Sequence, residues 1–432
     1  MGNATGNGRK ALRLVELIAI AIGGMVGGGI FAILGVSVSL VGNAAPVAVL
    51  IGGVLAFFAA YSYVKLAKLY KDEGATYSFF KRTFPDSGFA ACLIGWLVVF
   101  GYISTLALYA FTFSSYFCSQ FEALRHPYAQ KAVAGLVIAV FALINLRSVK
   151  GMGRLEDWLV YSKVLILILI SAVFTWKGDF STVQPVFGPE ATTMNILVVA
   201  AITFVAYEGF QLVIHAYNES VNPDKNVPRA IHLSVIIVTV LYVALAVAAL
   251  AAIPRNDLVN GKEYALAAGA GHHLGTPGLY LVLSGALLAT SSAISGTLFG
   301  ASRLMAVIAR DRNLPVFLAH KNRYDIPDYS IIVMSLAAFL LISTGGLQVI
   351  LEYGSVTFIV VSFLMAISNF RMRKETKTSV VMALIAMIGL ALAGGLIFYF
   401  EFTHSPGQLI YMAAIFGILT IGAYFYARHK PT

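Results

Sequence analysis

Residues 14–40 read LVELIAIAIGGMVGGGIFAILGVSVSL, and this stretch decides the fold class. A helix rises 1.5 Å per residue, so about 20 apolar residues suffice to cross the hydrocarbon core of a bilayer, which is about 30 Å thick. Glu16 is the only charged residue in the stretch, and it lies near the beginning. We therefore expect a membrane-spanning helix here, interrupted by its glycines.

The rest of the chain repeats this apolar character. Of its 432 residues, 59% are hydrophobic and 12% are charged, whereas soluble domains carry about 25% charged residues. The apolar stretches lack the alternating pattern of an outer-membrane barrel. We predict an all-α integral membrane protein, one domain over residues 1–432, with about twelve transmembrane helices. They lie near 14–40, 45–70, 89–117, 129–146, 155–177, 192–218, 229–252, 277–309, 329–345, 349–370, 378–400 and 407–427.

Basic residues predict the orientation. Lys and Arg gather in every second loop, and 24 of the 30 fall on the side that carries the first ten residues. Cytoplasmic loops are enriched in these residues. We therefore expect a protein of the plasma membrane with both termini on its cytoplasmic side. This distribution by loop parity also argues against a nucleic-acid partner, despite the net charge of +10.

Two of the predicted spans are interrupted at matching places. The first contains GGMVGGGIF at 23–31, and the sixth contains FVAYEGF at 204–210. Paired interruptions of this kind are typical of inverted repeats with a binding site at mid-membrane. We predict two five-helix repeats, about 12–177 and about 192–370, with broken helices 1 and 6, followed by helices 11 and 12 at about 378–427.

The glycines of the first span have two interpretations. Close helix packing would explain them, because Gly23/Gly27 and Gly24/Gly28 are small-xxx-small pairs. A break near Gly27–Gly29 would instead free amides that hold a carboxylate and carbonyls that hold an ammonium.

Three motifs resemble those of the amino acid/polyamine/organocation transporter superfamily, in particular its proton-coupled amino-acid branch. They are GGGIF at 27–31, FVAYEGF at 204–210 followed by NPDKNVPRAI at 222–231, and SGALLATSSA at 284–293 with ARDRNLP at 309–315. The resemblance covers at least the first ten spans. It implies an amino-acid or amine substrate, held by main-chain groups of the two broken helices.

The substrate-binding residues that the resemblance implies lie on both breaks. They are Met25, Gly27, Gly28, Gly29, Val205, Ala206, Tyr207, Glu208 and Gly209. Amides of Gly28 and Gly29 would hold the carboxylate, and carbonyls of Met25, Val205 and Glu208 would hold the amino group. The chain departs from the usual family pattern at Gly28, where a Ser or Ala is common, and at Glu208, where an apolar residue is common.

A carboxylate at mid-membrane costs at least about 2.5–3.5 kcal/mol, so Glu208 is expected to have a partner. Three interpretations stay open. Glu208 could recognise a cationic group of the substrate, bind the coupled proton, or form a neutral hydrogen bond inside the bundle.

Lys163 is the one basic residue predicted well inside a span. It could extend to the interface, or its buried ammonium could lose charge readily and act as a switch. The resemblance implies a proton-coupling site, in which a lysine replaces the sodium ion of sodium-driven relatives. The residues of that site would be Lys163, Gly23, Thr290, Ser291 and Ser292.

The sequence therefore predicts secondary active transport of amino acids or related amines by alternating access, with protons as the coupled ion. A polyamine or organic-cation carrier and an amino-acid exchanger are the alternatives within transport, and a receptor without transport is a distant third. No span carries a metal-ligand or nucleophile/base pattern, so we expect neither an enzyme nor a metal nor a cofactor. The sequence specifies neither the substrate's side chain nor an oligomeric state.

Overall fold

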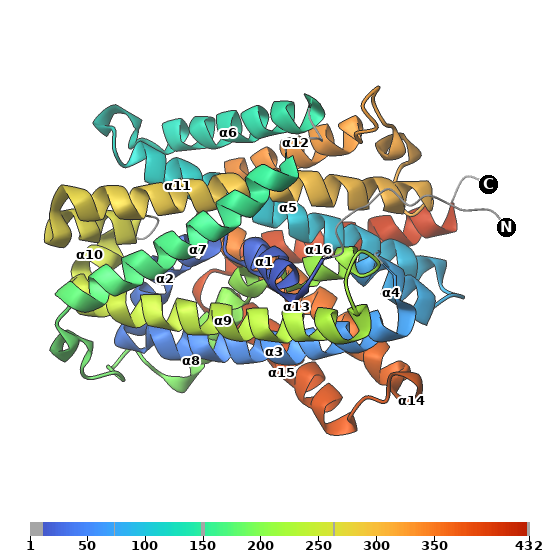
Figure 1. Ribbon diagram of the computed structural model, residues 1–432, viewed down its shortest axis with the longest axis horizontal. Helices are drawn as coiled ribbons and strands as arrows, with labels where there is room; N and C mark the ends of the chain where they lie inside the picture. Colours follow the sequence, from blue (N-terminus) through green and yellow to red (C-terminus); the bar gives the residue numbers. More distant parts are fainter. Residues whose placement is uncertain (1–11, 73, 148–151, 262–263, 430–432) are drawn as a thin grey trace.

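The computed structural model describes residues 12–72, 74–147, 152–261 and 264–429, and these ranges form one elongated bundle of helices (Figure 1). No β-strand occurs in the described ranges, which confirms the predicted all-α fold. The long helices are α3 (Ala45–Tyr70), α5 (Gly88–Cys118), α6 (Pro127–Arg147), α7 (Met152–Lys177), α9 (Pro223–Ala252), α11 (Ala265–Arg310), α12 (Asp328–Thr344), α13 (Leu347–Arg371), α15 (Val380–His404) and α16 (Pro406–Arg428).

Two of the predicted spans are discontinuous. The first consists of α1 (Leu14–Met25) and α2 (Gly29–Val41), and the sixth consists of α8 (Thr193–Ile202) with the 3₁₀ helices η4 (Thr203–Tyr207) and η5 (Phe210–Ala216). The interruption of the first span falls at Val26–Gly28, where a run of glycines lowers helix propensity by about 1 kcal/mol per residue. The predicted breaks in helices 1 and 6 are therefore present.

Within the described ranges, ten helical segments are long and apolar enough to cross a membrane. One of them, Gly29–Tyr70, contains the second half of the first predicted span and all of the second. The shorter apolar helices α1 and α12 supply the remaining first half and the ninth span. Counted in this way, the segments account for the twelve predicted spans.

The predicted eighth span is longer than expected. It was predicted to begin at 277, but α11 begins at Ala265 and bends at Gly275, whose positive φ of 72° suits a residue without a Cβ. The added turns pack near the short helix α10 (Arg255–Asn260). Both His272 and His273 contact the Oδ2 of Asp257, at 3.4 and 3.0 Å, and hydrogen bonding, chiefly from His273, lowers the pKa of that carboxyl. Two adjacent histidines thus meet one carboxylate at this end of the bundle.

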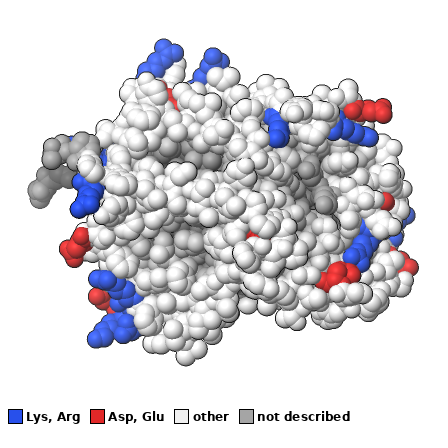
Figure 2. Space-filling view, turned by 180° about the vertical axis from the view of Figure 1, so that it is seen from behind, with Lys and Arg blue, Asp and Glu red and all other residues white. Residues whose placement is uncertain are grey.

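Charged residues are concentrated at the ends of the bundle. On the face in Figure 2, most charged side chains lie toward the two ends of the long axis, and the broad surface between them is largely uncharged. Large apolar side chains are also exposed on the long helices, for example Leu336 of α12 at 64% and Ile410 of α16 at 69%. This distribution fits a surface surrounded by lipid.

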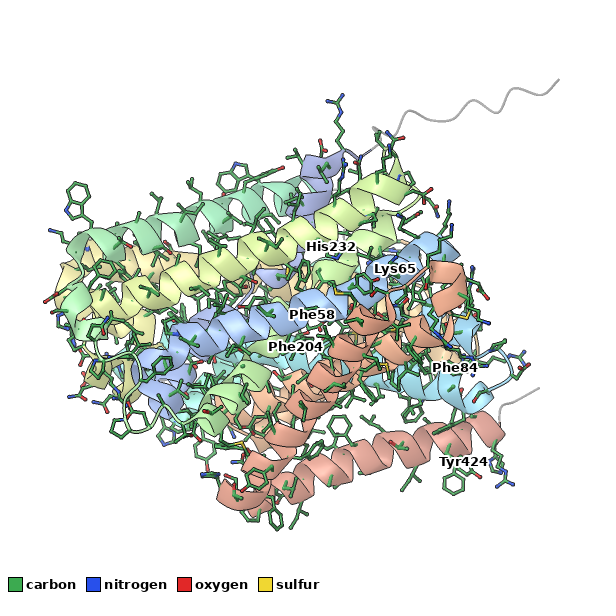
Figure 3. The ribbon with its side chains drawn as sticks, turned by 90° about the horizontal axis from the view of Figure 1, so that it is seen from below. Phe58, Lys65, Phe84, Phe204, His232 and Tyr424 are labelled. Carbon is green, nitrogen blue, oxygen red and sulfur yellow. The ribbon has the colours of Figure 1, made fainter. Side chains whose placement is uncertain are left out.

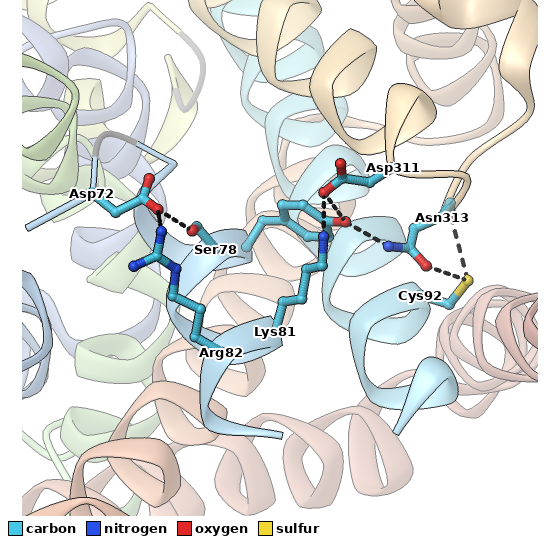
Figure 4. A network of polar contacts seen from close by, with 8 residues as sticks. Asp72, Ser78, Lys81, Arg82, Cys92, Asp311 and Asn313 are labelled. Atoms are coloured by element: carbon cyan, nitrogen blue, oxygen red, sulfur yellow. Dashed lines mark hydrogen bonds and ion pairs between the residues drawn. The ribbon is translucent and has the colours of Figure 1, made fainter. Parts of the chain in front are cut away.

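The end with the basic loops is reinforced by a polar network between α4 (Ala75–Thr83) and the segment after α11 (Figure 4). Tyr77 and Lys81 both donate to Asp311, at 2.9 and 2.7 Å, and Asn313 donates to the hydroxyl of Tyr77 at 2.5 Å. Figure 3 shows Lys65, Phe84 and Tyr424 toward this end, whereas Phe204 of η4 lies near the middle. The break of the sixth span is therefore at mid-bundle.

Candidate functional site

The two helix breaks meet in space. A Cβ on Gly209 would collide with the backbone of Gly24, and a Cβ on Gly24 would lie 2.9 Å from the carbonyl oxygen of Gly209. Gly209 also has a φ of 127°, which side chains of L-residues rarely allow. Glycine at both positions lets the main chains of the first and sixth spans touch.

One tyrosine joins the two breaks. The hydroxyl of Tyr242, on α9, is 2.8 Å from the carbonyl of Met25 and 3.3 Å from the carbonyl of Ala206. Tyr242 is fully buried and its ring lies 5.4 Å from that of Tyr207. A hydroxyl has only one proton, so it can fully satisfy only one of these carbonyls at a time.

A serine on α13 supports the sixth span from its other side. Ser355 donates to the carbonyl of Ile202 at 2.5 Å and accepts from the amide of Val205 at 3.3 Å. Both main-chain groups lie where α8 ends and η4 begins. Ser355 thus connects α13 to the main chain where η4 begins.

A cavity of about 200 Å³ opens beside the paired breaks. Its lining comes from α1, α5, α7, η5, α11 and α13, and it includes Gly23, Gly24, Tyr102, Tyr109, Val160, Glu208, Gly209, Gln211, His215, Ser292, Thr297, Gly300 and Leu304. Along α11 the lining runs from Ser292 toward Leu304, which is the direction of Arg310 and the basic end. The cavity therefore extends from the breaks toward the end that carries the basic loops.

Glu208 is the buried acidic group of this cavity. Its Oε2 accepts a hydrogen bond of 2.9 Å from Gln211, whose own Oε1 accepts from the amide of Gly209 at 3.0 Å. The Oε1 of Glu208 is buried and has no hydrogen-bond partner among the described residues. Tyr102, within hydrogen-bonding range of Gln211, and Tyr109 line the same space. One oxygen of Glu208 is thus available to a cationic group or a proton.

Lys163 of α7 contacts the end of α1, directly before the first break. It is 2% exposed, and its Nζ donates to the carbonyl of Gly23 at 2.6 Å and approaches the hydroxyl of Ser292 at 3.5 Å. Thr290 directs its hydroxyl to the carbonyl of Ala286, in its own helix, at 2.6 Å. Ser291 is half-buried on the next position of α11. The lysine therefore connects α7 to α1 and α11, and it does not extend to the interface.

The predicted substrate-binding residues separate into two groups. Glu208 and Gly209 line the cavity, as do Gly23 and Ser292 of the predicted coupling site. The other seven lie outside its lining: Met25, Gly27, Gly28, Gly29, Val205, Ala206 and Tyr207.

Packing explains several members of the second group. A Cβ on Gly28 would lie 2.8 Å from Thr290 Cγ2, and one on Gly27 would lie 2.8 Å from the ring of Tyr109. The hydroxyl of Tyr207 donates to the carbonyl of Val49 on α3, outside the cavity. Close helix packing, one of the two interpretations of the glycines, is therefore part of their role. The first helix hydrogen bond of α2 joins the amide of Ala32 to Gly28, so the amides of Gly29 and Ile30 precede it.

Comparison with known proteins decides the family. The amino acid permease family model matches residues 12–427, which is nearly the whole chain. The chain belongs to the amino acid permease family. Inner membrane transport protein YbaT of Escherichia coli is 28% identical, with 100% of this chain and 99% of that protein covered.

Two further relatives have names that state a substrate class. The branched-chain amino acid permease BcaP of Bacillus subtilis is 26% identical over 73% of this chain and 71% of its own length. The large neutral amino acids transporter small subunit 2 of Rattus norvegicus is 27% identical over 80% and 66%. The permease is thus a membrane transporter of the amino acid/polyamine/organocation superfamily and not an enzyme.

Sequence reasoning missed some of the residues that build this permease's site. Gln211 was not singled out, although it lies one helical turn after Glu208 and pairs with it. Tyr242 was missed as well, and a tyrosine within the apolar span 229–252 was the available signal.

Proposed function

We propose that the permease is a proton-coupled secondary transporter of amino acids or closely related amines that works by alternating access. The observation that carries this proposal is the contact of Lys163 Nζ with the carbonyl of Gly23, beside Ser292. These groups belong to three different spans. A proton on Lys163 strengthens the contacts with both partners, and its loss weakens them.

The cavity volume supports a small substrate. About 200 Å³ is below the range of about 300–1,000 Å³ that is typical for drug-sized ligands. The cavity extends toward the basic loops, which the positive-inside rule assigns to the cytoplasm. We assign the structure to an inward-directed state in a plasma membrane, with the termini, which lie outside the described residues, in the cytoplasm.

Main-chain groups at the breaks are the proposed anchors for the substrate's carboxylate and amino group. The amides of Gly28 and Gly29 stand at the start of α2, where the helix dipole favours an anion. The hydroxyl of Tyr242 is within hydrogen-bonding distance of the carbonyls of Met25 and Ala206 in this state, so an ammonium would share these carbonyls with the tyrosine or displace it. Substrate binding and the position of Tyr242 are therefore proposed to be linked.

Substitution of Lys163 tests the coupling. Purified Lys163→Ala protein in proteoliposomes is expected to lose pH-gradient-driven accumulation of amino acids while it retains exchange of labelled substrate at equal pH. The reason is that the substrate anchors remain while the protonatable contact between α1, α7 and α11 is gone. Accumulation that still follows the proton gradient in this variant would contradict the proposal.

A second candidate, a carrier for diamines or other organic cations, is favoured by the unpartnered Oε1 of Glu208. Glu208→Gln keeps the shape of the side chain and removes its charge. If Glu208 selects cations, this variant is expected to lose affinity for diamines and basic amino acids by about tenfold or more. The reason is that the buried cationic group of the substrate would lose its charged partner. Neutral amino acids would change little.

Competition assays with neutral and basic substrates measure that difference. Equal loss for all substrates with retained exchange assigns Glu208 to proton coupling, and loss of folded protein assigns it a structural hydrogen bond. Unaltered relative affinities would exclude charge selection and favour neutral amino acids.

A further inference from the structure

Two buried glutamates lie outside the cavity, between α13 and α15. Glu352 and Glu401 are both 0% exposed, and neither lines the cavity. Glu352 Oε1 accepts from the side-chain amide of Gln348 at 2.8 Å. Glu352 Oε2 and both carboxyl oxygens of Glu401 find no donor among the described residues when both groups are treated as acceptors. Buried polar atoms are usually hydrogen-bonded, so these three oxygens call for a donor.

The two carboxyl groups lie within hydrogen-bonding range of each other. Two ionised carboxylates can only accept, so in that state they would face each other without a proton and repel. If one carboxyl keeps its proton, its O–H donates to the other in a short, charge-assisted hydrogen bond. One proton therefore resolves both the repulsion and the missing donor.

No Lys or Arg offers an alternative partner in the described surroundings. The titratable groups that face the pair are His404, Tyr353 and Tyr411. His404 is exposed, stacks on Phe400 at 4.4 Å, and has its Nδ1 3.1 Å from that residue's carbonyl oxygen. The halves of α3, α5 and α8 toward this end carry no Asp, Glu, Lys, Arg or His.

The pair is close to the support of the sixth span. Glu352 precedes Ser355 by three residues on α13, and Ser355 holds the main chain of Ile202 and Val205. Gly354, the residue before Ser355, also packs on Val205, since a Cβ at this position would lie 3.0 Å from that side chain. Glu401 lies on α15, which follows both predicted repeats. Contact between the glutamates thus joins an appended helix to the helix that supports the break.

We propose that Glu352 and Glu401 form a proton-binding carboxyl pair that fastens α15 to α13 while it holds a proton. The pair lies near the ends of these helices that are opposite the basic loop 371–377, so in the proposed orientation it faces the exterior. External alkalinity would remove the proton, separate the two charged groups and loosen α13 beside the break. This site is independent of the substrate cavity and of Lys163.

Thermal unfolding of the purified permease, without substrate or gradient, tests the pair. The wild-type midpoint is expected to fall from mildly acidic to mildly alkaline pH, because two buried negative charges then repel. In Glu352→Gln and in Glu401→Gln the amide donates to the remaining carboxylate at every pH, so this shift is lost in both. Glu375→Gln, which changes an exposed glutamate of the short helix α14 (Arg373–Thr376), is the matched control and is expected to keep the wild-type shift.

Infrared spectroscopy provides a second readout that does not depend on the stability of these variants. A Glu208→Gln protein retains the pair, and it is expected to show the carbonyl stretch of a protonated carboxyl that disappears at alkaline pH. A wild-type midpoint that does not change with pH would overturn the proposal. The same pH shift in both Gln variants would also overturn it, and so would stabilisation of the wild type alone by Na⁺ or Ca²⁺, which would indicate a metal-cation site. Failure of proton-driven uptake would leave this result unaffected.

Discussion

At the scale of single residues, glycine has two different uses beside the cavity. Gly27 and Gly28 lie where a Cβ would approach Tyr109 or Thr290 within 3 Å, so there is no space for a side chain. Gly300 also lines the cavity, but a Cβ there would have no atom within 4 Å. A bulky substitution at Gly28 would therefore mix a packing defect with a binding defect, whereas Gly300 separates the two.

Gly300→Leu is expected to abolish substrate binding and transport, because the new side chain projects from α11 into a cavity of about 200 Å³. Its unfolding free energy is expected to be equal to or up to about 1 kcal/mol above the wild-type value, since leucine favours a helix interior over glycine. Binding by scintillation proximity and thermal unfolding of the purified protein measure the two effects.

Gly395→Leu is the matched control. Gly395 lies on the exposed side of α15, and a Cβ there also has no atom within 4 Å. This variant is expected to transport normally. Wild-type binding by Gly300→Leu would show that the substrate does not occupy this part of the cavity.

At the scale of elements, the two broken spans depend on helices outside the breaks. Tyr242 on α9 reaches the carbonyls of Met25 and Ala206, and Ser355 on α13 supports the start of η4. A break exposes main-chain groups that cannot remain unpaired in a bundle without water. The neighbouring helices therefore stabilise the broken conformation.

Tyr242→Phe is expected to lower the unfolding free energy by about 1 kcal/mol, because one buried hydroxyl donor is lost while the ring stays packed. The proposed link to substrate binding also predicts a changed apparent affinity, which competition binding would measure. Tyr426→Phe removes a hydroxyl that donates to the carbonyl of Leu314, away from the cavity, and is expected to leave affinity unchanged. The link would be refuted if both variants bound substrate like the wild type.

At the scale of the whole molecule, the asymmetric distribution of basic residues predicts how the bundle is inserted. The loop 371–377 and helix α4 lie at one end of the bundle, and α10 lies at the other (Figure 1). Both native cysteines, Cys92 and Cys118, are buried, so introduced cysteines can be labelled against a low background.

In intact cells, an impermeant maleimide is expected to label Glu122→Cys, which lies in an exposed loop before α6. Lys374→Cys, exposed on α14, is expected to react only after the cells are permeabilised. The positive-inside rule is the physical reason for this difference. The opposite labelling pattern would contradict the proposed orientation. It would mean that the cavity extends toward the exterior.

The sequence by itself determined the features that depend on local composition. Apolar length predicted where the spans lie, although α11 begins twelve residues before the predicted start at 277, because crossing lipid imposes a minimum run of apolar positions. The five glycines at 23–29 and the single Gly209 predicted where the first and sixth spans break, since glycine lowers helix stability wherever it lies. The low charge content located Glu208 and Lys163 as costly and therefore distinctive residues.

Only the tertiary structure decided which of these residues meet. Gly24 touches Gly209, and Lys163 reaches Gly23, across sequence separations that no local pattern encodes. Met25, Gly28 and Tyr207 lie outside the cavity lining, and the hydroxyl of Tyr207 donates to the carbonyl of Val49 on α3. The physical reason is that each helix has several apolar faces of similar hydrophobicity. Side-chain packing and the satisfaction of buried polar groups therefore select the face that lines the cavity.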